Sequence, residues 1–320
     1  MLSPTIGLRL ATVTLNPTID RVIRVPGFAV GQHLVGRLHS RTPAGKAINV
    51  SRAMAALGMP SVALGWVGRE SIEAFNAAAR AAGFTPQFSP MAGTTRENIT
   101  VIDPQGPCET HIREIGPTVT AEEIDRLTDD LRWTADDDVI VVFTGSLAPG
   151  LPPERFGDMI ESCVTRGARV VVDTSQAPLR QALEHKVWMI KPNLVELAEL
   201  VGREIATDDE IVRTGLELAD RIPLVLITAG ERGAFCFAED AAQHARVTIP
   251  PERFRSTVGC GDALLAGFLS GLVATNGTRE SALRQGVAVA AASAMNDLPA
   301  VFAAEDVETL RPSVQLRHLA

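Results

Sequence analysis

Short apolar runs rich in β-branched residues alternate along this chain with amphipathic helical patterns. Several of the runs are almost continuously apolar, as expected for strands that are covered on both faces. The predicted strands are 8–15, 61–67, 139–144, 168–172, 187–190 and 224–227. The predicted helices are 71–82, 121–131, 154–166, 195–201, 208–221 and 261–275. This alternation predicts an α/β fold with a largely parallel sheet, whose ligands bind at the carboxyl ends of the strands.

Two regions, 21–41 and 94–115, interrupt this alternation. Both show extended patterns in which polar and apolar residues alternate between turns. The second region contains a hairpin signal at 103–106, Asp-Pro-Gln-Gly. We expect the two regions to pair into a small sheet outside the main body, although two separate surface hairpins would give the same pattern.

A glycine-rich turn leads directly into an apolar helix at Ser256-Thr-Val-Gly-Cys-Gly-Asp-Ala-Leu-Leu-Ala-Gly-Phe268. Such a turn directs several backbone N–H groups at one point, where the helix dipole adds positive charge, and so predicts an anion hole. Asp262 lies at its mouth, where a carboxylate would repel a bound phosphate. A general base that deprotonates an attacking hydroxyl explains this position, and simple capping of the helix is the alternative.

A second glycine turn, Thr42-Pro-Ala-Gly-Lys-Ala-Ile-Asn49, opens another amphipathic helix with Lys46, Asn49 and Arg52 near its start. Asn193 and Glu196 are three residues apart at a helix start, which puts both side chains on one face. That pair suits a hydrated Mg²⁺, but it also fits a capping box, and the local sequence leaves both readings open.

Composition narrows the class of ligand. The chain has 320 residues and a formal net charge of −8, so its overall field favours neither nucleic acid nor an anionic membrane. An anionic substrate must therefore be held by local cations and backbone amides. Cys108, Cys163, Cys236 and Cys260 are scattered without metal-ligand spacing, which indicates free thiols in a reducing cytoplasm. No segment approaches the roughly 20 apolar residues of a membrane span.

Together the two glycine motifs resemble the paired signatures of the ribokinase-like sugar kinases, the PfkB family. Further landmarks follow in the family's order: Thr14-Leu-Asn-Pro-Thr-Ile-Asp20, Thr95-Arg-Glu-Asn98, Thr144-Gly-Ser-Leu-Ala-Pro-Gly150 and Lys191-Pro-Asn-Leu-Val-Glu-Leu197. The resemblance implies a three-layer α/β/α sandwich with a mostly parallel central sheet and a small β-sheet lid. It also implies one kinase domain over 1–320, with the lid at about 21–41 and 94–115, and a homodimer formed through the lid.

The resemblance also assigns roles to individual residues, with ATP and Mg²⁺ as cofactors and a phosphosugar as substrate. It makes Asp262 the catalytic base and the amides of Gly259, Cys260 and Gly261 the anion hole. The residues expected to bind the sugar phosphate are Asp20, Gly45, Lys46, Asn49, Arg96 and Ser146. The residues expected to bind ATP are Lys191, Asn193, Thr228, Gly230, Gly233 and Asn296. Asn193 and Glu196 would hold the metal through water.

The motifs look most like the branch of the family that acts on sugar phosphates, the 1-phosphofructokinases and tagatose-6-phosphate kinases. Ala44-Gly-Lys-Ala47 is closer to the 1-phosphofructokinase form, so we expect fructose 1-phosphate to be converted to fructose 1,6-bisphosphate. Tagatose 6-phosphate and fructose 6-phosphate remain alternatives, because Ala47 and the segment 33–34 depart from the family pattern. Cys260 replaces the usual alanine, but no departure removes a catalytic group. A non-catalytic sugar-phosphate-binding regulator is the alternative of another class, whereas a nicotinamide-dependent Rossmann enzyme lacks its GxGxxG after the first strand.

Overall fold

A ten-stranded sheet forms the centre of the computed structural model, which describes residues 8–105, 109–239, 241–274 and 278–319. Its strands are parallel from β5 to β11, and β12, β13 and β14 complete it in antiparallel order. From one edge the strands are β14 (Gln315–His318), β13 (Ala241–Arg246), β12 (Ala234–Ala238), β11 (Leu224–Thr228), β10 (Met189–Ile190), β9 (Arg169–Asp173), β8 (Val139–Thr144), β1 (Arg9–Thr14), β4 (Ser61–Gly68) and β5 (Thr85–Met91). The predicted α/β fold with a largely parallel sheet is confirmed.

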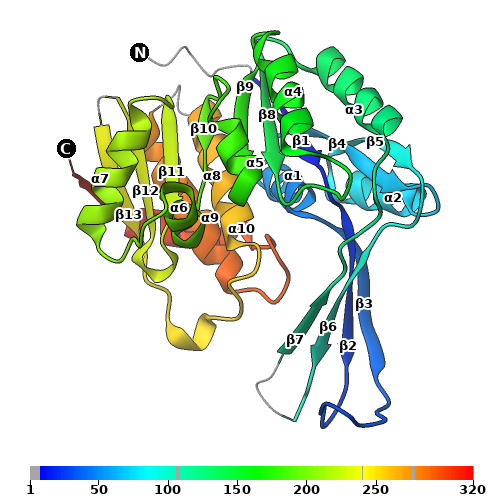
Figure 1. Ribbon diagram of the computed structural model, residues 1–320. Helices are drawn as coiled ribbons and strands as arrows, with labels where there is room; N and C mark the ends of the chain where they lie inside the picture. The colour runs from blue at the N-terminus through cyan, green and yellow to red at the C-terminus, as the bar shows by residue number, and fades with distance from the viewer. Residues whose placement is uncertain (1–7, 106–108, 240, 275–277, 320) are drawn as a thin grey trace.

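Helices cover both faces of this sheet, which makes the three layers visible in Figure 1. One face carries α3 (Ala121–Thr134), α4 (Pro153–Val164), α5 (Gln176–Ala182), α6 (Leu194–Val201) and α7 (Asp208–Ala219). The other carries α1 (Lys46–Ala56), α2 (Ile72–Ala82), α8 (Cys260–Ala274), α9 (Arg279–Ala294) and α10 (Ala304–Leu310). Short 3₁₀ turns lie at η1 (Gly230–Arg232), η2 (Pro251–Arg253) and η3 (Arg311–Ser313). No described helix is long and apolar enough to cross a bilayer.

The apolar strands contribute side chains to the hydrophobic cores on both faces of the sheet. In β8, Val141 and Phe143 belong to the core under α3 and α4, whereas Ile140 and Val142 belong to the core under α8. All four side chains are fully buried. This is the two-residue period of a strand covered on both sides, and it explains why the run is apolar throughout.

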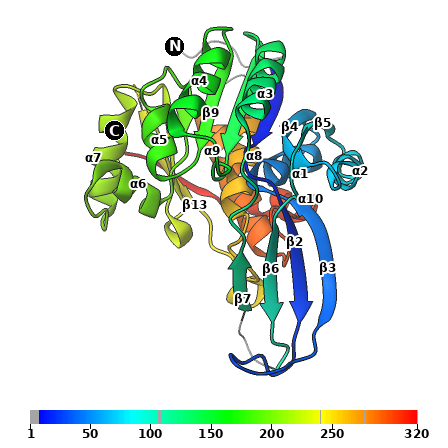
Figure 2. The same ribbon diagram turned by 45° about the vertical axis from the view of Figure 1, so that its right-hand side comes forward.

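A second, four-stranded sheet projects from the main body (Figures 1 and 2). It consists of β3 (Arg37–Ala44), β2 (Thr18–Arg24), β6 (Glu97–Ile102) and β7 (Glu109–Arg113). Each predicted region forms an antiparallel hairpin, and the parallel pairing of β2 with β6 joins the two hairpins into one small sheet. The predicted hairpin turn is stabilised by the Asp103 carboxylate, which accepts from the Gln105 and Gly27 N–H groups; residue 106 lies outside the described residues.

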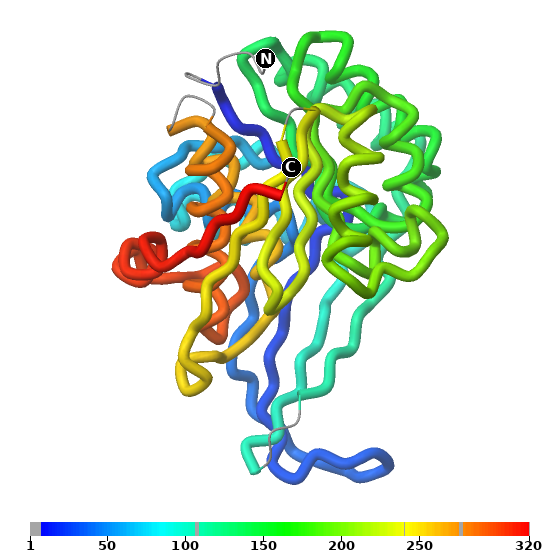
Figure 3. Tube along the Cα trace, turned by 90° about the vertical axis from the view of Figure 1, so that its left-hand side faces the viewer, coloured from blue at the N-terminus to red at the C-terminus, as the bar shows by residue number. Residues whose placement is uncertain are grey.

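The termini of several predicted elements shift slightly in the structure. The helix expected over 261–275 begins at Cys260, and its last predicted residue is outside the described part of the chain. Asn296, expected to bind ATP, lies beyond the end of α9 at Ala294. Its side chain instead donates to the Ala292 carbonyl oxygen at 3.0 Å and closes the helix end. In the trace of Figure 3, the C-terminal strand β14 runs along the sheet edge.

Candidate active site

Two of the predicted site residues, Lys191 and Thr228, lie at the carboxyl ends of the parallel strands, together with polar residues that were not predicted. Thr14 ends β1, Thr144 ends β8, Asp173 ends β9 and Thr228 ends β11, and Lys191 directly follows β10. The small sheet leaves the main body from this same end, because β2 and α1 continue from it. This is where an open parallel sheet binds its ligands, as the sequence predicted.

Asp262 is a buried carboxylate in the first turn of α8, and it is 5% exposed. The Asn49 side-chain amide, from the start of α1, donates to its Oδ2 at 2.9 Å. Burial, and after it the charge of Asp173, raises the pKa of Asp262 to about 6, against the opposing effects of Lys46, Asn49 and Lys191. A carboxylate with such a pKa is deprotonated near neutral pH and still accepts a proton readily, which suits a general base.

Asp173, which the sequence analysis missed, lies fully buried beside Asp262. Its Oδ1 is 3.2 Å from the Lys191 ammonium nitrogen and 3.7 Å from that of Lys46, and Thr144 donates to its Oδ2 at 3.0 Å. Burial alone would raise the pKa of Asp173, but the two ammonium groups bring it below its usual value. The signal that could have found it is an acidic residue directly after an apolar strand.

The glycine turn before α8 is built as predicted but partly for another reason. Gly259 has φ 79°, and a Cβ there would lie 2.6 Å from the Ala300 nitrogen, so packing against that backbone excludes a side chain. A Cβ on Gly261 would instead lie 3.5 Å from the Lys191 ammonium nitrogen, so this glycine does open toward the site. The Cys260 N–H donates to the Thr257 carbonyl oxygen at 3.2 Å, a long bond that an anion would have to replace.

Asp20 lies on β2 at the other side of the site. The Asn98 side-chain amide on β6 donates to its carboxylate at 3.2 Å. Burial raises the pKa of Asp20, and the Asn98 hydrogen bond and the charges of Arg96 and Arg52 oppose the increase. Gly45 and Asn49 belong to the start of α1, between Asp20 on one side and Asp262 on the other. Asp20, Gly45, Asn49 and Asp262 can therefore line one path for an acceptor hydroxyl.

Arg96 is held more tightly than a surface cation. Its guanidinium donates to the backbone carbonyl oxygens of Asn16 at 3.0 Å, Pro17 at 3.2 Å and Glu114 at 2.9 Å. These bonds join the two hairpins of the small sheet to the end of β1. Since a guanidinium has five N–H donors, two remain for an anion. Ser146 is connected to the same junction by the Asn16 side chain, 3.3 Å from its hydroxyl oxygen.

The residues predicted to bind nucleotide lie at the ends of β10 and β11. Lys191 is buried at 4% exposure, and the Thr228 N–H donates to the Pro192 carbonyl oxygen at 3.1 Å. Gly230, with φ 60°, borders open space. At Gly233 a Cβ would lie 2.1 Å from the Ala245 carbonyl oxygen, so the close approach of β13 requires this glycine whether or not a phosphate binds.

Asn193 and Glu196 form a capping box at the start of α6. The Asn193 Oδ1 accepts from the Glu196 N–H and the Glu196 Oε2 accepts from the Asn193 N–H, both at 2.9 Å. Of the two alternatives for this motif, the structure shows the capping box, with both of its hydrogen bonds. The charge of Glu196 also contributes to raising the pKa of Lys46, so this carboxylate faces the site. Within the described residues its second oxygen has no hydrogen bond, and it fits a water-mediated metal.

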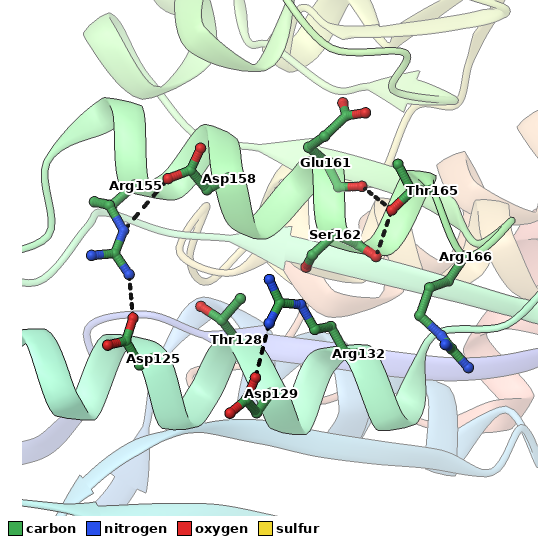
Figure 4. A pocket seen from close by; sticks show the side chains of 10 residues that line it. All are labelled: Asp125, Thr128, Asp129, Arg132, Arg155, Asp158, Glu161, Ser162, Thr165 and Arg166. Carbon is green, nitrogen blue, oxygen red and sulfur yellow. Dashed lines mark hydrogen bonds and ion pairs between the residues drawn. The ribbon is translucent and has the colours of Figure 1, made fainter.

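Other polar features lie elsewhere. The acidic cluster Asp136, Asp137 and Asp138 is exposed and precedes β8, at the end of the sheet opposite the site. A groove between α3 and α4 (Figure 4) contains none of the predicted site residues. Its charged side chains are largely paired with one another, Arg155 with Asp125 and Asp158, and Arg132 with Asp129.

The three-layer α/β/α architecture with a small second sheet is the ribokinase-like fold, which it shares with solved kinase structures. The model of the pfkB family carbohydrate kinases matches residues 13–298, and the chain belongs to this family. It is therefore a carbohydrate kinase that uses ATP as the phosphoryl donor.

The chain is similar over nearly its whole length to two relatives named 1-phosphofructokinase. It is 33% identical to a 1-phosphofructokinase of Bacillus subtilis, covering 96% of this chain and 99% of the relative, and 32% identical to one of Vibrio cholerae, covering 97% of each. Its fold matches phosphofructokinase-2 of Escherichia coli in complex with potassium, with a TM-score of 0.89 at 26% identity over 95% of this chain and 98% of the other. A possible 1-phosphofructokinase of Thermotoga maritima matches with a TM-score of 0.85 at 25% identity over 98% and 100%.

Proposed function

We propose that this protein transfers the γ-phosphoryl group of ATP to fructose 1-phosphate and so produces fructose 1,6-bisphosphate. The single observation that carries the chemistry is Asp262, a buried carboxylate at the start of α8. It accepts a hydrogen bond from the Asn49 side chain, and its pKa is raised to about 6. The choice of acceptor is supported by the nearly full-length similarity to the two 1-phosphofructokinases.

In this proposal Asp262 takes the proton from the acceptor hydroxyl. The hydroxyl oxygen forms a bond to the γ-phosphorus, and the bond from that phosphorus to the β,γ-bridging oxygen breaks. ADP leaves with the electron pair of the broken bond, and the proton stays on the Asp262 carboxylate. The burial of Asp262 increases the basicity of the carboxylate.

The phosphates of ATP would lie between the start of α8 and the ends of β10 and β11. The amides of Gly259, Cys260 and Gly261 would stabilise the transferring group, with Lys191 below them. The remaining nucleotide contacts are assigned to Asn193, Thr228, Gly230, Gly233 and Asn296. Mg²⁺ would be held through water by Glu196 with Asn193, and it would neutralise phosphate charge.

The acceptor would lie between the small sheet and α1. Asp20 would accept hydrogen bonds from sugar hydroxyls, and Gly45 and Asn49 would let the sugar approach Asp262. Arg96 and Ser146, which share the junction around Asn16, would bind the phosphate that the acceptor already carries. The small sheet would then act as a lid on one kinase domain, in a cytoplasmic enzyme.

We further propose a homodimer through this lid, which carries apolar side chains that the chain itself leaves exposed. Val35 is 89% exposed, Leu38 56%, Ile112 50% and Ile115 80%. An exposed apolar patch of this kind indicates a surface that is covered by a partner. Light scattering is expected to give twice the chain mass, and a monomer at assay concentration would contradict the dimer.

Fructose 6-phosphate is the second candidate acceptor. It is favoured by the similarity to phosphofructokinase-2 of E. coli, which has been solved in complex with fructose 6-phosphate, at a TM-score of 0.87 and 25% identity. Tagatose 6-phosphate, of nearly equal size, is a third. A non-catalytic regulator is disfavoured because Asp262 and both flanking glycines are present.

A coupled ADP-release assay tests the proposed function. With MgATP, we expect turnover of fructose 1-phosphate, and far slower turnover of fructose and ribose, because the free sugars lack the phosphate that Arg96 would bind. Turnover restricted to a free sugar would contradict the assignment of Arg96, and no turnover of any of these acceptors would favour the regulator.

A further inference from the structure

Lys46, which was expected to bind the sugar phosphate, lies beside Asp173. It is the first residue of α1, and its stem passes over Gly145, where a Cβ would lie 3.7 Å from the Lys46 Cβ. The ammonium nitrogen is 3.7 Å from the Asp173 Oδ1, and the side chain keeps 44% exposure. The resemblance had grouped Lys46 with Arg96 as a ligand of the acceptor's own phosphate.

The charges around the two cations separate them. The charge of Asp173 raises the pKa of the Lys46 ammonium, and burial opposes this increase. The charges of Asp262 and Glu196 add to the increase, so the pKa is raised overall. The carboxylates acting on Arg96 are Asp20 and Glu114, which belong to the small sheet and its connection. Lys46 therefore belongs with the base and the nucleotide end, whereas Arg96 belongs with the acceptor end.

We propose that Lys46 is a catalytic residue that stabilises the phosphoryl group during its transfer and does not bind the phosphate that the acceptor carries. The inference rests on the proposed function and refines it. Asp173 is shared by two lysines, of which Lys191 is closer, at 3.2 Å, and buried. Lys46 can therefore leave Asp173 for the equatorial oxygens of the γ-phosphorus while Lys191 keeps that carboxylate paired. A cation that interacts with negative charge only as this charge develops in the transition state lowers the barrier and does not tighten substrate binding in the ground state.

The test compares Lys46→Met with Arg96→Met, because methionine keeps an unbranched apolar stem and removes the charge. For Lys46→Met we expect kcat to fall by about 10²-fold or more. The Kd of fructose 1-phosphate, measured by calorimetry without nucleotide, is expected to stay within about threefold of the wild type, whereas Arg96→Met should weaken binding about tenfold. A Lys46→Met variant with weakened fructose 1-phosphate binding and a retained kcat would overturn the proposal.

The pH dependence of kcat/KM provides a second test, because a lysine with only a structural role would leave it unchanged. Lys46, with Lys191 and Asn49, opposes the increase in the Asp262 pKa caused by burial and Asp173. The acid limb of kcat/KM, expected near pH 6 in the wild type, should move to higher pH in Lys46→Met and return in Lys46→Arg. Thermal melting confirms that each variant is folded. Wild-type protein that phosphorylates no sugar phosphate would defeat the proposed function, whereas an active wild type with a fully active Lys46→Met defeats only this inference.

Discussion

Replacing Asp262 by asparagine is expected to lower kcat by about 10³-fold while both substrates still bind, because the acceptor hydroxyl loses its base. Asparagine has nearly the same shape and can keep a hydrogen bond with Asn49, which now holds the carboxylate at 2.9 Å. Steady-state kinetics with fructose 1-phosphate and MgATP, together with calorimetric binding of each, measure the two effects separately.

The folded state of this variant gives its own check. Since the pKa of Asp262 is raised to about 6, its charged form costs the folded protein stability above that pH. Asp262→Asn should therefore melt no lower than the wild type near pH 7.5. The matched control is Asp129→Asn on the exposed surface of α3, where kcat should stay within about twofold. Asp262→Asn with near wild-type turnover would remove Asp262 from the mechanism.

Replacing Asp173 by alanine is expected to destabilise the fold by about 3–5 kcal/mol at neutral pH, because it leaves the Lys191 ammonium buried without its carboxylate. The ion pair lies at 1% and 4% side-chain exposure, so the unpaired ammonium would remain largely out of contact with bulk water. Urea unfolding followed by circular dichroism measures the change in the free energy of unfolding.

The control for this prediction is Asp138→Ala, which removes a carboxylate of the same type from an exposed pair. Arg9 donates to both Asp138 oxygens, at 3.0 and 2.7 Å, at the opposite end of the sheet. Exposed ion pairs contribute little to stability, so the unfolding midpoint should hardly change. Equal midpoints for Asp173→Ala and Asp138→Ala would show that the buried pair does not stabilise the site.

The sequence could predict the parallel part of the sheet because those strands are buried on both faces and so are continuously apolar. It could not predict β5, whose edge position tolerates Pro86 and Pro90 in a strand. It also missed β12 and β13, where alanines have low strand propensity and the pairing with β11 decides the conformation.

The site was predictable where a local motif carries the signal. The glycine turn and Asp262 lie in one short segment, whereas the hydrogen bond from Asn49 to Asp262 was not predicted. Asp173 was missed because its role comes from two lysines distant in sequence. The carbonyl contacts of Arg96 and the direction of Lys46 also depend on long-range packing, which spacing along the chain does not encode.

The proposed reaction is tested most directly by the ratio of kcat/KM for fructose 1-phosphate to kcat/KM for fructose 6-phosphate and for tagatose 6-phosphate, measured by ADP release under identical conditions. The account predicts a ratio of at least about 10² in favour of fructose 1-phosphate, since a site built to bind one polar substrate group loses several kcal/mol when that group is misplaced. A ratio below one for either competitor would contradict fructose 1-phosphate as the substrate and would assign the same site to that competitor.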